Sequence, residues 1–175
     1  MGEQSPTTPR IYVACLAAYN NGYLHGQWID ADQDEEAIFA EIHAMLLRSP
    51  VRDAEEYAIH DYEGFEGVAL KEYSAVGTVV RIAAFLAEHG ALGGAVLAHF
   101  CGNLDEATQA LTDGYMGAFE SLADYVQELT EETTSIPEPL RYYIDWAAMA
   151  RDVEMNGDVF TIATAQDAVH VFAAG

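Results

Sequence analysis

The stretch Ile11-Tyr-Val-Ala-Cys-Leu-Ala-Ala-Tyr-Asn-Asn-Gly-Tyr-Leu-His-Gly-Gln-Trp-Ile29 decides the fold that we predict. Its first half, residues 11–19, is a strand-length apolar run. Asn21-Gly22 is a strong hairpin signal because both residue types tolerate positive φ, and residues 23–29 are the returning strand. A helix begins after Asp30 with carboxylates in its first turn, where the helix dipole favours them. Residues 57–60 are predicted as a third strand, so the stretch opens a small α+β unit.

The helix of this unit is predicted to bury one stripe and to end at Pro50. The stripe consists of Ile38, Phe39, Ile42, Met45 and Leu46.

The middle of the chain is predicted to be helical. A second apolar stripe ends at His89-Gly90 and is followed by a short apolar helix over 95–100. Asn103 is a predicted N-cap with Glu106 as its capping-box partner, and Gly114 is predicted to end that helix as a C′ glycine. The stripe consists of Val76, Val79, Val80, Ala83 and Leu86.

The last third is predicted to return to α+β structure. Ser121 caps a helix whose inward residues are Leu122, Tyr125, Val126 and Leu129. A further helix covers 140–155 and stops at Gly157. Residues 158–164 and 169–172, with Gln166-Asp167 between them, read as a closing β-hairpin. We therefore predict the class α+β, with a flexible N-terminal tail (1–9), an α+β domain (10–68), a mostly helical domain (69–111) and a second α+β domain (112–175).

Charge is the most informative property of the composition. The chain has 29 Asp and Glu against 7 Lys and Arg, a formal net charge of −22. Such a surface repels nucleic acids and anionic membranes and attracts basic surfaces. Duplex DNA carries one charge per ~1.7 Å of axis, so this charge corresponds to roughly 11 base pairs. Three interpretations are open: a halophile's solvated coat, an acidic partner-binding module, or an imitation of DNA. The apolar half of the composition and its many aromatics do not favour the first, nor a disordered acidic tail.

No pattern indicates catalysis, a metal ligand set or a cofactor. Residues 30–41 place acids at positions 1, 3, 5, 7 and 12 of an EF-hand loop, but Glu35 stands where the sharp turn needs glycine, so an acid-rich helix start is favoured. The six histidines have no ligand spacing, and the glycines form no nucleotide-binding loop. We predict that the protein is not an enzyme.

We also predict that the protein is cytoplasmic. No secretory signal or membrane-spanning run is evident in the sequence. Cys15 and Cys101 lie far apart in apolar surroundings and are predicted to be reduced thiols.

Four blocks of the sequence resemble the ArdA antirestriction proteins. They are residues 11–30, 56–65, 114–125 and 143–152, the last with Gly157-Asp158, and they follow the family's order. The resemblance implies a non-enzymatic DNA mimic that plasmids and conjugative transposons carry into a recipient cell. It implies an elongated chain of three small domains, and dimers formed through the C-terminal part. Its partner would be a type I restriction–modification enzyme, bound at the methyltransferase core in place of DNA, and the mimic itself would bind no nucleic acid. The alternative is a generic acidic module or a chaperone for basic DNA-binding proteins.

Two sets of residues are predicted to form the binding surfaces. Residues 115–121 are rich in aromatics, Met and Gly, which favours a homodimer interface, unless these residues pack inside the C-terminal domain. That interface is predicted to contain Tyr115, Met116, Gly117, Phe119 and Ser121. The DNA-mimicking set, called the acidic surface below, comprises Asp30, Asp32, Asp34, Glu35, Glu36, Glu41, Asp53, Glu55, Glu56, Asp61, Glu63, Glu66, Asp105, Glu106, Asp113, Glu120, Asp124, Glu128, Glu131 and Glu132.

Overall fold

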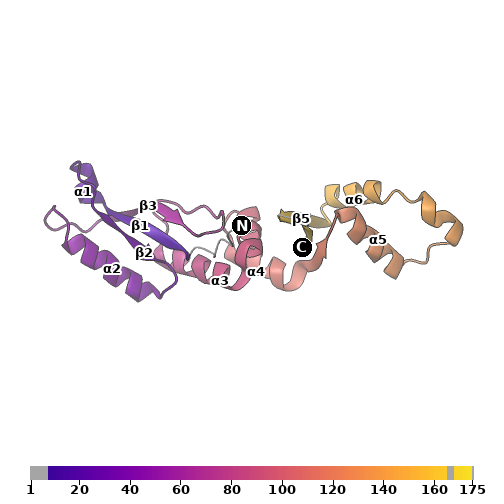
Figure 1. Cartoon of the computed structure of the whole chain (residues 1–175), viewed down its shortest axis with the longest axis horizontal. Helices are drawn as coiled ribbons and strands as arrows, with labels where there is room; N and C mark the ends of the chain where they lie inside the picture. The colour runs from indigo at the N-terminus through magenta and orange to yellow at the C-terminus, as the bar shows by residue number, and fades with distance from the viewer. Residues whose placement is uncertain (1–7, 165–167, 175) are drawn as a thin grey trace, which may run out of the picture. The chain divides into compact units, whose positions relative to one another are not determined.

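The computed structural model describes residues 8–164 and 168–174 and divides the chain into two compact units, residues 1–102 and 103–175 (Figure 1). Helix makes up 49% and strand 21% of the chain, which agrees with the predicted α+β class. The three-domain division stays a prediction. Most of the predicted tail (1–9) and the turn at Gln166-Asp167 lie outside the described residues.

The first unit is built on an antiparallel sheet in the order β2-β1-β3, formed by β1 (Arg10–Cys15), β2 (Gly26–Asp30) and β3 (Tyr57–Glu63). Ile11, Val13 and Cys15 alternate along β1 and are fully buried. Alternation of this kind buries one face of a sheet, here against α2 (Glu35–Leu47). The predicted three strands and helix of this unit are confirmed.

The connection between β1 and β2 differs from the prediction. The strand ends at Cys15, and α1 (Leu16–Asn20) takes the next five residues. The Cys15 thiol accepts the amide of Ala18 at 3.5 Å and so caps this helix. Asn21 has φ −98°, so the predicted two-residue turn with positive φ at both positions is wrong, although the two strands do pair.

Helix α2 begins at Glu35, a few residues later than the predicted start after Asp30 but within the same acid-rich stretch. The Asp34 carboxylate accepts the Ala37 amide at 2.7 Å, and Glu35 and Glu36 occupy the first turn. The predicted stripe is buried with the exception of Phe39, whose side chain is 41% exposed. Phe39 is one position past Ile38 and faces away from the sheet.

Helix α3 (Val76–His99) continues past the predicted stop but is broken there. Gly90 has φ 63° and ψ −149°, a conformation that is almost confined to glycine, so two helical segments meet at this residue. In the second predicted stripe, Val80 is half-buried and the others are buried. By length and composition alone, α3 could cross a membrane, unlike any other helix in the described part, but it is also a core helix of this unit.

The second unit starts with two short helical segments. The Asn103 side chain accepts the amides of Asp105 and Glu106, which confirms it as the N-cap of α4 (Leu104–Gln109). The π-helical turn η1 (Ala110–Gly114) follows. Gly114 does not adopt positive φ, so its prediction as a C′ glycine is wrong. A Cβ at this position would lie 3.1 Å from the Ala173 carbonyl, so glycine serves close approach to the next sheet.

This second sheet has the order β4-β6-β5, from β4 (Tyr115–Phe119), β5 (Val159–Thr164) and β6 (Ala168–Ala173). The antiparallel pair β5–β6 confirms the predicted closing hairpin. Phe172 is fully buried, and its ring stacks on Phe160 with centroids 4.9 Å apart. The sequence did not predict β4 as a strand, because its partner β6 is about fifty residues away.

Helices α5 (Leu122–Thr133) and α6 (Trp146–Met155) pack together, and the 3-10 turn η2 (Glu138–Tyr143) joins them. Ser121 caps α5 as predicted, but Leu129 is 44% exposed rather than inward. The predicted helix over 140–155 begins only at Trp146, because Asp145 caps it by accepting the Ala148 amide at 3.0 Å. Gly157, with φ 77°, ends it as predicted.

Candidate acidic binding surface

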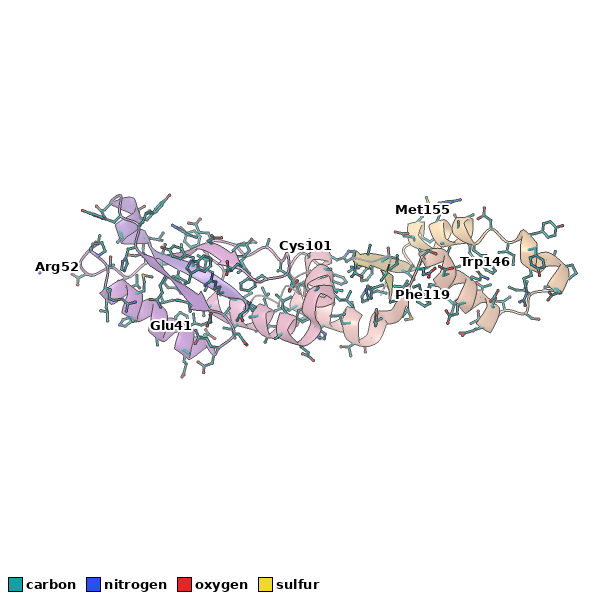
Figure 2. All side chains as sticks on the ribbon, in the orientation of Figure 1. Glu41, Arg52, Cys101, Phe119, Trp146 and Met155 are labelled. Atoms are coloured by element: carbon teal, nitrogen blue, oxygen red, sulfur yellow. The ribbon has the colours of Figure 1, made fainter. Side chains whose placement is uncertain are left out.

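Carboxylates cover both units. Every residue of the acidic surface is exposed except Glu41 and Glu63, which are half-buried. In the described part of the chain, no polar or charged side chain is buried. Figure 2 shows side chains along the whole described ribbon, with Glu41 on α2. Exposed charges of this kind contribute little to the stability of the fold.

Basic residues cannot neutralise this surface. Even if each of the 7 Lys and Arg paired with one carboxylate, 22 of the 29 would remain unbalanced. Arg10 pairs with Glu63 and lies over the Trp28 ring, 4.6 Å from its centroid. Arg141 approaches Glu138 at 3.8 Å. The surface is therefore strongly negative over both units.

The acids near the start of α2 have local structural roles as well as charge. Asp34 is the N-cap, and the dipole of α2 stabilises Glu35 and Glu36. Gln33 donates to the Asp30 carbonyl at 2.8 Å and to the Glu41 carboxylate at 2.5 Å. Among the residues that the structure describes, no three His, Cys, Asp or Glu side chains are arranged to hold a metal ion.

Helix α5 presents a regular acidic stripe. Asp124, Glu128 and Glu131 are spaced i, i+4 and i+7, and Glu132 adjoins them, so all four project from one side of the helix. The four side chains are exposed, while Val126 on the opposite side is buried. Gln127 donates to Glu131 at 3.1 Å. This stripe places four exposed carboxylates on one side of a single helix.

The predicted dimer residues lie on and next to an edge strand. β4 pairs with β6 on one side only, and Tyr115 and Met116 are 39% and 42% exposed. The Tyr115 hydroxyl and His170 Nδ1 are 2.8 Å apart. Gly117, at φ 117°, lies in a register shift of this strand. An edge of this kind offers unpaired backbone groups to a second chain.

Phe119 and Ser121 are half-buried and have roles within one chain. Phe119 is half-buried, and its ring contacts Tyr125 edge-on with centroids 5.2 Å apart (labelled in Figure 2). Ser121 accepts the Asp124 amide at 3.2 Å, and its hydroxyl donates to the Asp124 carboxylate at 2.8 Å. Tyr115 and Met116 are therefore the more accessible candidates for an interface.

The predicted acidic surface omitted further exposed carboxylates. Five of the seven follow Pro137, and three of those lie in the predicted helix over 140–155. The exposure of those in the helix was predictable from the sequence, because the polar residues of an amphipathic helix project outward. They are Glu72, Glu88, Glu138, Asp145, Asp152, Glu154 and Asp158.

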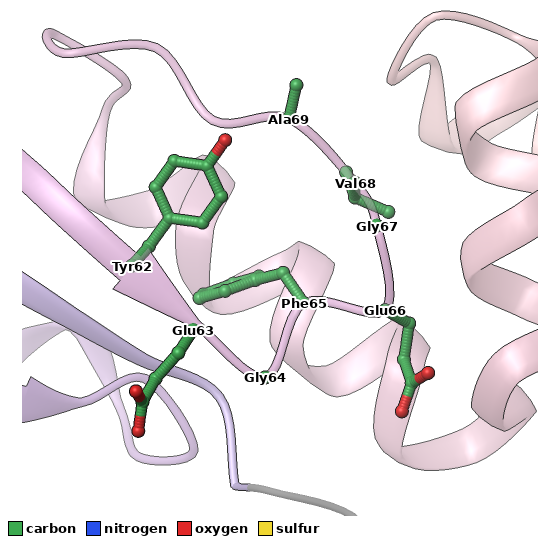
Figure 3. A pocket seen from close by; sticks show the side chains of 8 residues that line it. All are labelled: Tyr62, Glu63, Gly64, Phe65, Glu66, Gly67, Val68 and Ala69. Carbon is green, nitrogen blue, oxygen red and sulfur yellow. The ribbon is translucent and has the colours of Figure 1, made fainter.

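A shallow hollow of about 270 Å³ lies along the loop that follows β3 (Figure 3). Residues 62–69 line it, and the side chains of Glu63 and Glu66 extend away from the rings of Tyr62 and Phe65. The two rings meet edge-on at 5.9 Å. Glu63 pairs with Arg10, and Glu66 is exposed.

Comparison with known proteins identifies the chain's relatives. The family model described as "Antirestriction protein (ArdA)" matches residues 11–167. A search of curated proteins gave no match.

Proposed function

Because the chain belongs to the ArdA antirestriction family, we propose that it inhibits type I restriction–modification enzymes by occupying their DNA-binding groove as a mimic of DNA. Membership of the family implies an antirestriction function and an interaction with restriction–modification enzymes in general. The proposal adds the mechanism, the enzyme type and the methyltransferase core as the binding site. Mobile elements would carry the protein, which would act as a homodimer in the cytoplasm of the recipient cell.

The observation that supports mimicry is the exposure of the carboxylates. The α5 stripe from Asp124 to Glu132 spans eight residues, or about 12 Å at a rise of ~1.5 Å per residue. The gaps between successive acids are about 6, 4.5 and 1.5 Å along the axis. Their mean of about 4 Å compares with ~3.4 Å of axis per phosphate of one DNA strand. A groove built to hold phosphates would accept such a row.

Inhibition kinetics test the proposal. If the protein and DNA compete for one groove, the concentration that halves cleavage by a type I enzyme rises in proportion to the DNA concentration. Inhibition should also weaken as salt is added, since screening reduces attraction between exposed charges. A half-inhibitory concentration that is independent of DNA concentration would contradict the proposal. Equal binding to unrelated basic proteins would instead favour the generic acidic module.

A further inference from the structure

The η2 turn exposes large apolar side chains between α5 and α6. Tyr142 and Tyr143 are each 86% exposed, more than any other aromatic side chain in the described part of the chain, and Leu140 is 56% exposed. Isolated exposed apolar residues are ordinary, but a contiguous group on a strongly charged protein marks an interaction site.

The backbone that carries these side chains is restricted at the start of the turn. Pro137 and Pro139 restrict the backbone at its start, and the Leu140 amide donates to the Pro137 carbonyl at 2.9 Å. In Figure 1 the orange η2 ribbon projects beyond the ends of α5 and α6 and away from the β5 strand of this unit. A pre-ordered, projecting turn loses little conformational entropy on binding.

The surroundings of the two rings select a cationic partner. Exposed carboxylates flank the turn in sequence on both sides: Glu131 and Glu132 before it, Glu138 within it and Asp145 after it. The positive charge of Arg141 is offset by the nearby Glu138 carboxylate. A tyrosine face flanked by acids suits an arginine, because the guanidinium stacks on the ring while its N–H groups reach carboxylates.

We propose that Tyr142 and Tyr143 are aromatic anchors that receive arginine side chains from the DNA-binding surface of the restriction–modification enzyme. This inference rests on the proposed function. Carboxylates can replace phosphates, but they offer an arginine no flat aromatic face on which to stack. The two tyrosines supply such faces. Tyr and Arg are also the residue types that dominate binding energy at interfaces.

The test measures affinity for a type I methyltransferase core over a range of salt concentrations. The double variant Tyr142→Ala, Tyr143→Ala should bind about 10-fold more weakly at every salt concentration, because two ring–guanidinium contacts are lost. The slope of affinity against salt should stay the same, because no charge has changed. The variant Tyr142→Phe, Tyr143→Phe should bind nearly as the wild type does, since it keeps both rings.

Controls separate this effect from others. Tyr73, which is 71% exposed in the first unit, provides the matched change Tyr73→Ala, expected to leave affinity unaltered. The variant Glu131→Gln, Glu132→Gln should instead reduce the salt slope. If the double alanine variant loses helical circular dichroism, the single variants Tyr142→Ala and Tyr143→Ala are measured, each with a smaller loss expected.

Three results would overturn or relocate the inference. Unchanged affinity in a folded double variant that still displaces DNA would refute the anchors and leave the proposed function standing. Failure of the wild type itself to displace DNA would refute the proposed function. A lower mass of the double variant in sedimentation equilibrium would assign the tyrosines to a contact between two copies, which also contradicts the inference.

Discussion

At the scale of single residues, two glycines of helix α3 differ in how much space a side chain would have. A Cβ on Gly94 would lie 2.6 Å from the Glu66 Cβ and 2.8 Å from the Glu66 carbonyl oxygen, so the helix and this loop must move apart. A Cβ on Gly77 would meet only the end of the Glu35 side chain, at 3.2 Å. Gly94→Ala should therefore lower the free energy of unfolding by about 1–3 kcal/mol.

Gly77→Ala is the matched control in the same helix. The Glu35 carboxylate can rotate aside, and alanine has a helix propensity better than glycine by up to ~1 kcal/mol. Its free energy of unfolding should be unchanged or higher. Urea titrations of the two variants and the wild type provide the comparison. Equal destabilisation by both substitutions would show that the contact with the Glu66 loop is not the cause.

The two cysteines differ in exposure, although the sequence predicts apolar surroundings for both. Both are free thiols, but Cys15 is buried and Cys101 is exposed. Cys101 sits at the end of α3 with φ 55°, where the chain turns away from the core. A thiol reagent such as Ellman's should modify Cys101 in the native protein within the mixing time and Cys15 only on unfolding. A wild type and a Cys101→Ser variant that react alike would disprove this assignment.

At the scale of elements, local signals predicted the starts of α4 and α5, and non-local pairing was missed. Asp34, Asn103 and Ser121 cap helices because a short polar side chain beside its own backbone suffices. β4 was not predicted, because an edge strand is defined by a distant partner. Residues 16–19 were assigned to a strand, since their apolar run does not distinguish a short helix from a strand.

The candidate surfaces were predictable in a similar, partial way. Exposure of the acids followed from their charge, because an unpaired carboxylate is rarely buried. The partial burial of Phe119 against Tyr125 depends on how α5 packs on the sheet, which no local pattern contains. The exposure of Tyr142 and Tyr143 was not predicted, because the sequence analysis assigned both residues to a continuous helix over 140–155.

The α5 stripe gives a prediction for a whole element. Glu131→Gln alone should leave inhibition almost unchanged, because one exposed charge contributes about 0–1 kcal/mol and is screened. Neutralising Asp124, Glu128, Glu131 and Glu132 together should weaken binding about 10-fold and flatten its salt dependence. The measurement is a titration against the methyltransferase core at several salt concentrations.

A matched block near the start of α2 extends this test. Asp30→Asn, Asp32→Asn, Glu35→Gln and Glu36→Gln change four charges and leave the Asp34 cap in place. This block should weaken binding to a similar degree without melting the helix. Abolition of binding by one substitution in a folded protein would contradict a distributed charge surface.

At the scale of the whole molecule, both units contribute charge. Residues 1–102 have 15 acids and 5 Lys or Arg, a net of −10, and residues 103–175 have 14 and 2, a net of −12. Two such chains repel each other, so the proposed homodimer should strengthen as salt increases, opposite to target binding. Sedimentation equilibrium at low and high salt measures this.

The variant for this test is Met116→Asp, on the exposed edge of β4. It should shift the chain towards monomer while leaving the contact between Phe119 and Tyr125 intact. A wild type that is monomeric at micromolar concentration in high salt would exclude the dimer. An undiminished dimer in folded Met116→Asp would place the interface elsewhere.

Displacement of DNA tests the central claim most directly. A type I methyltransferase core is loaded with DNA bearing one fluorophore and titrated with this protein bearing another at Cys101. We predict that DNA leaves the enzyme as the protein binds, with both signals changing at the same protein concentration and with excess DNA reversing the exchange. A ternary complex that retains DNA and protein together would contradict mimicry of DNA.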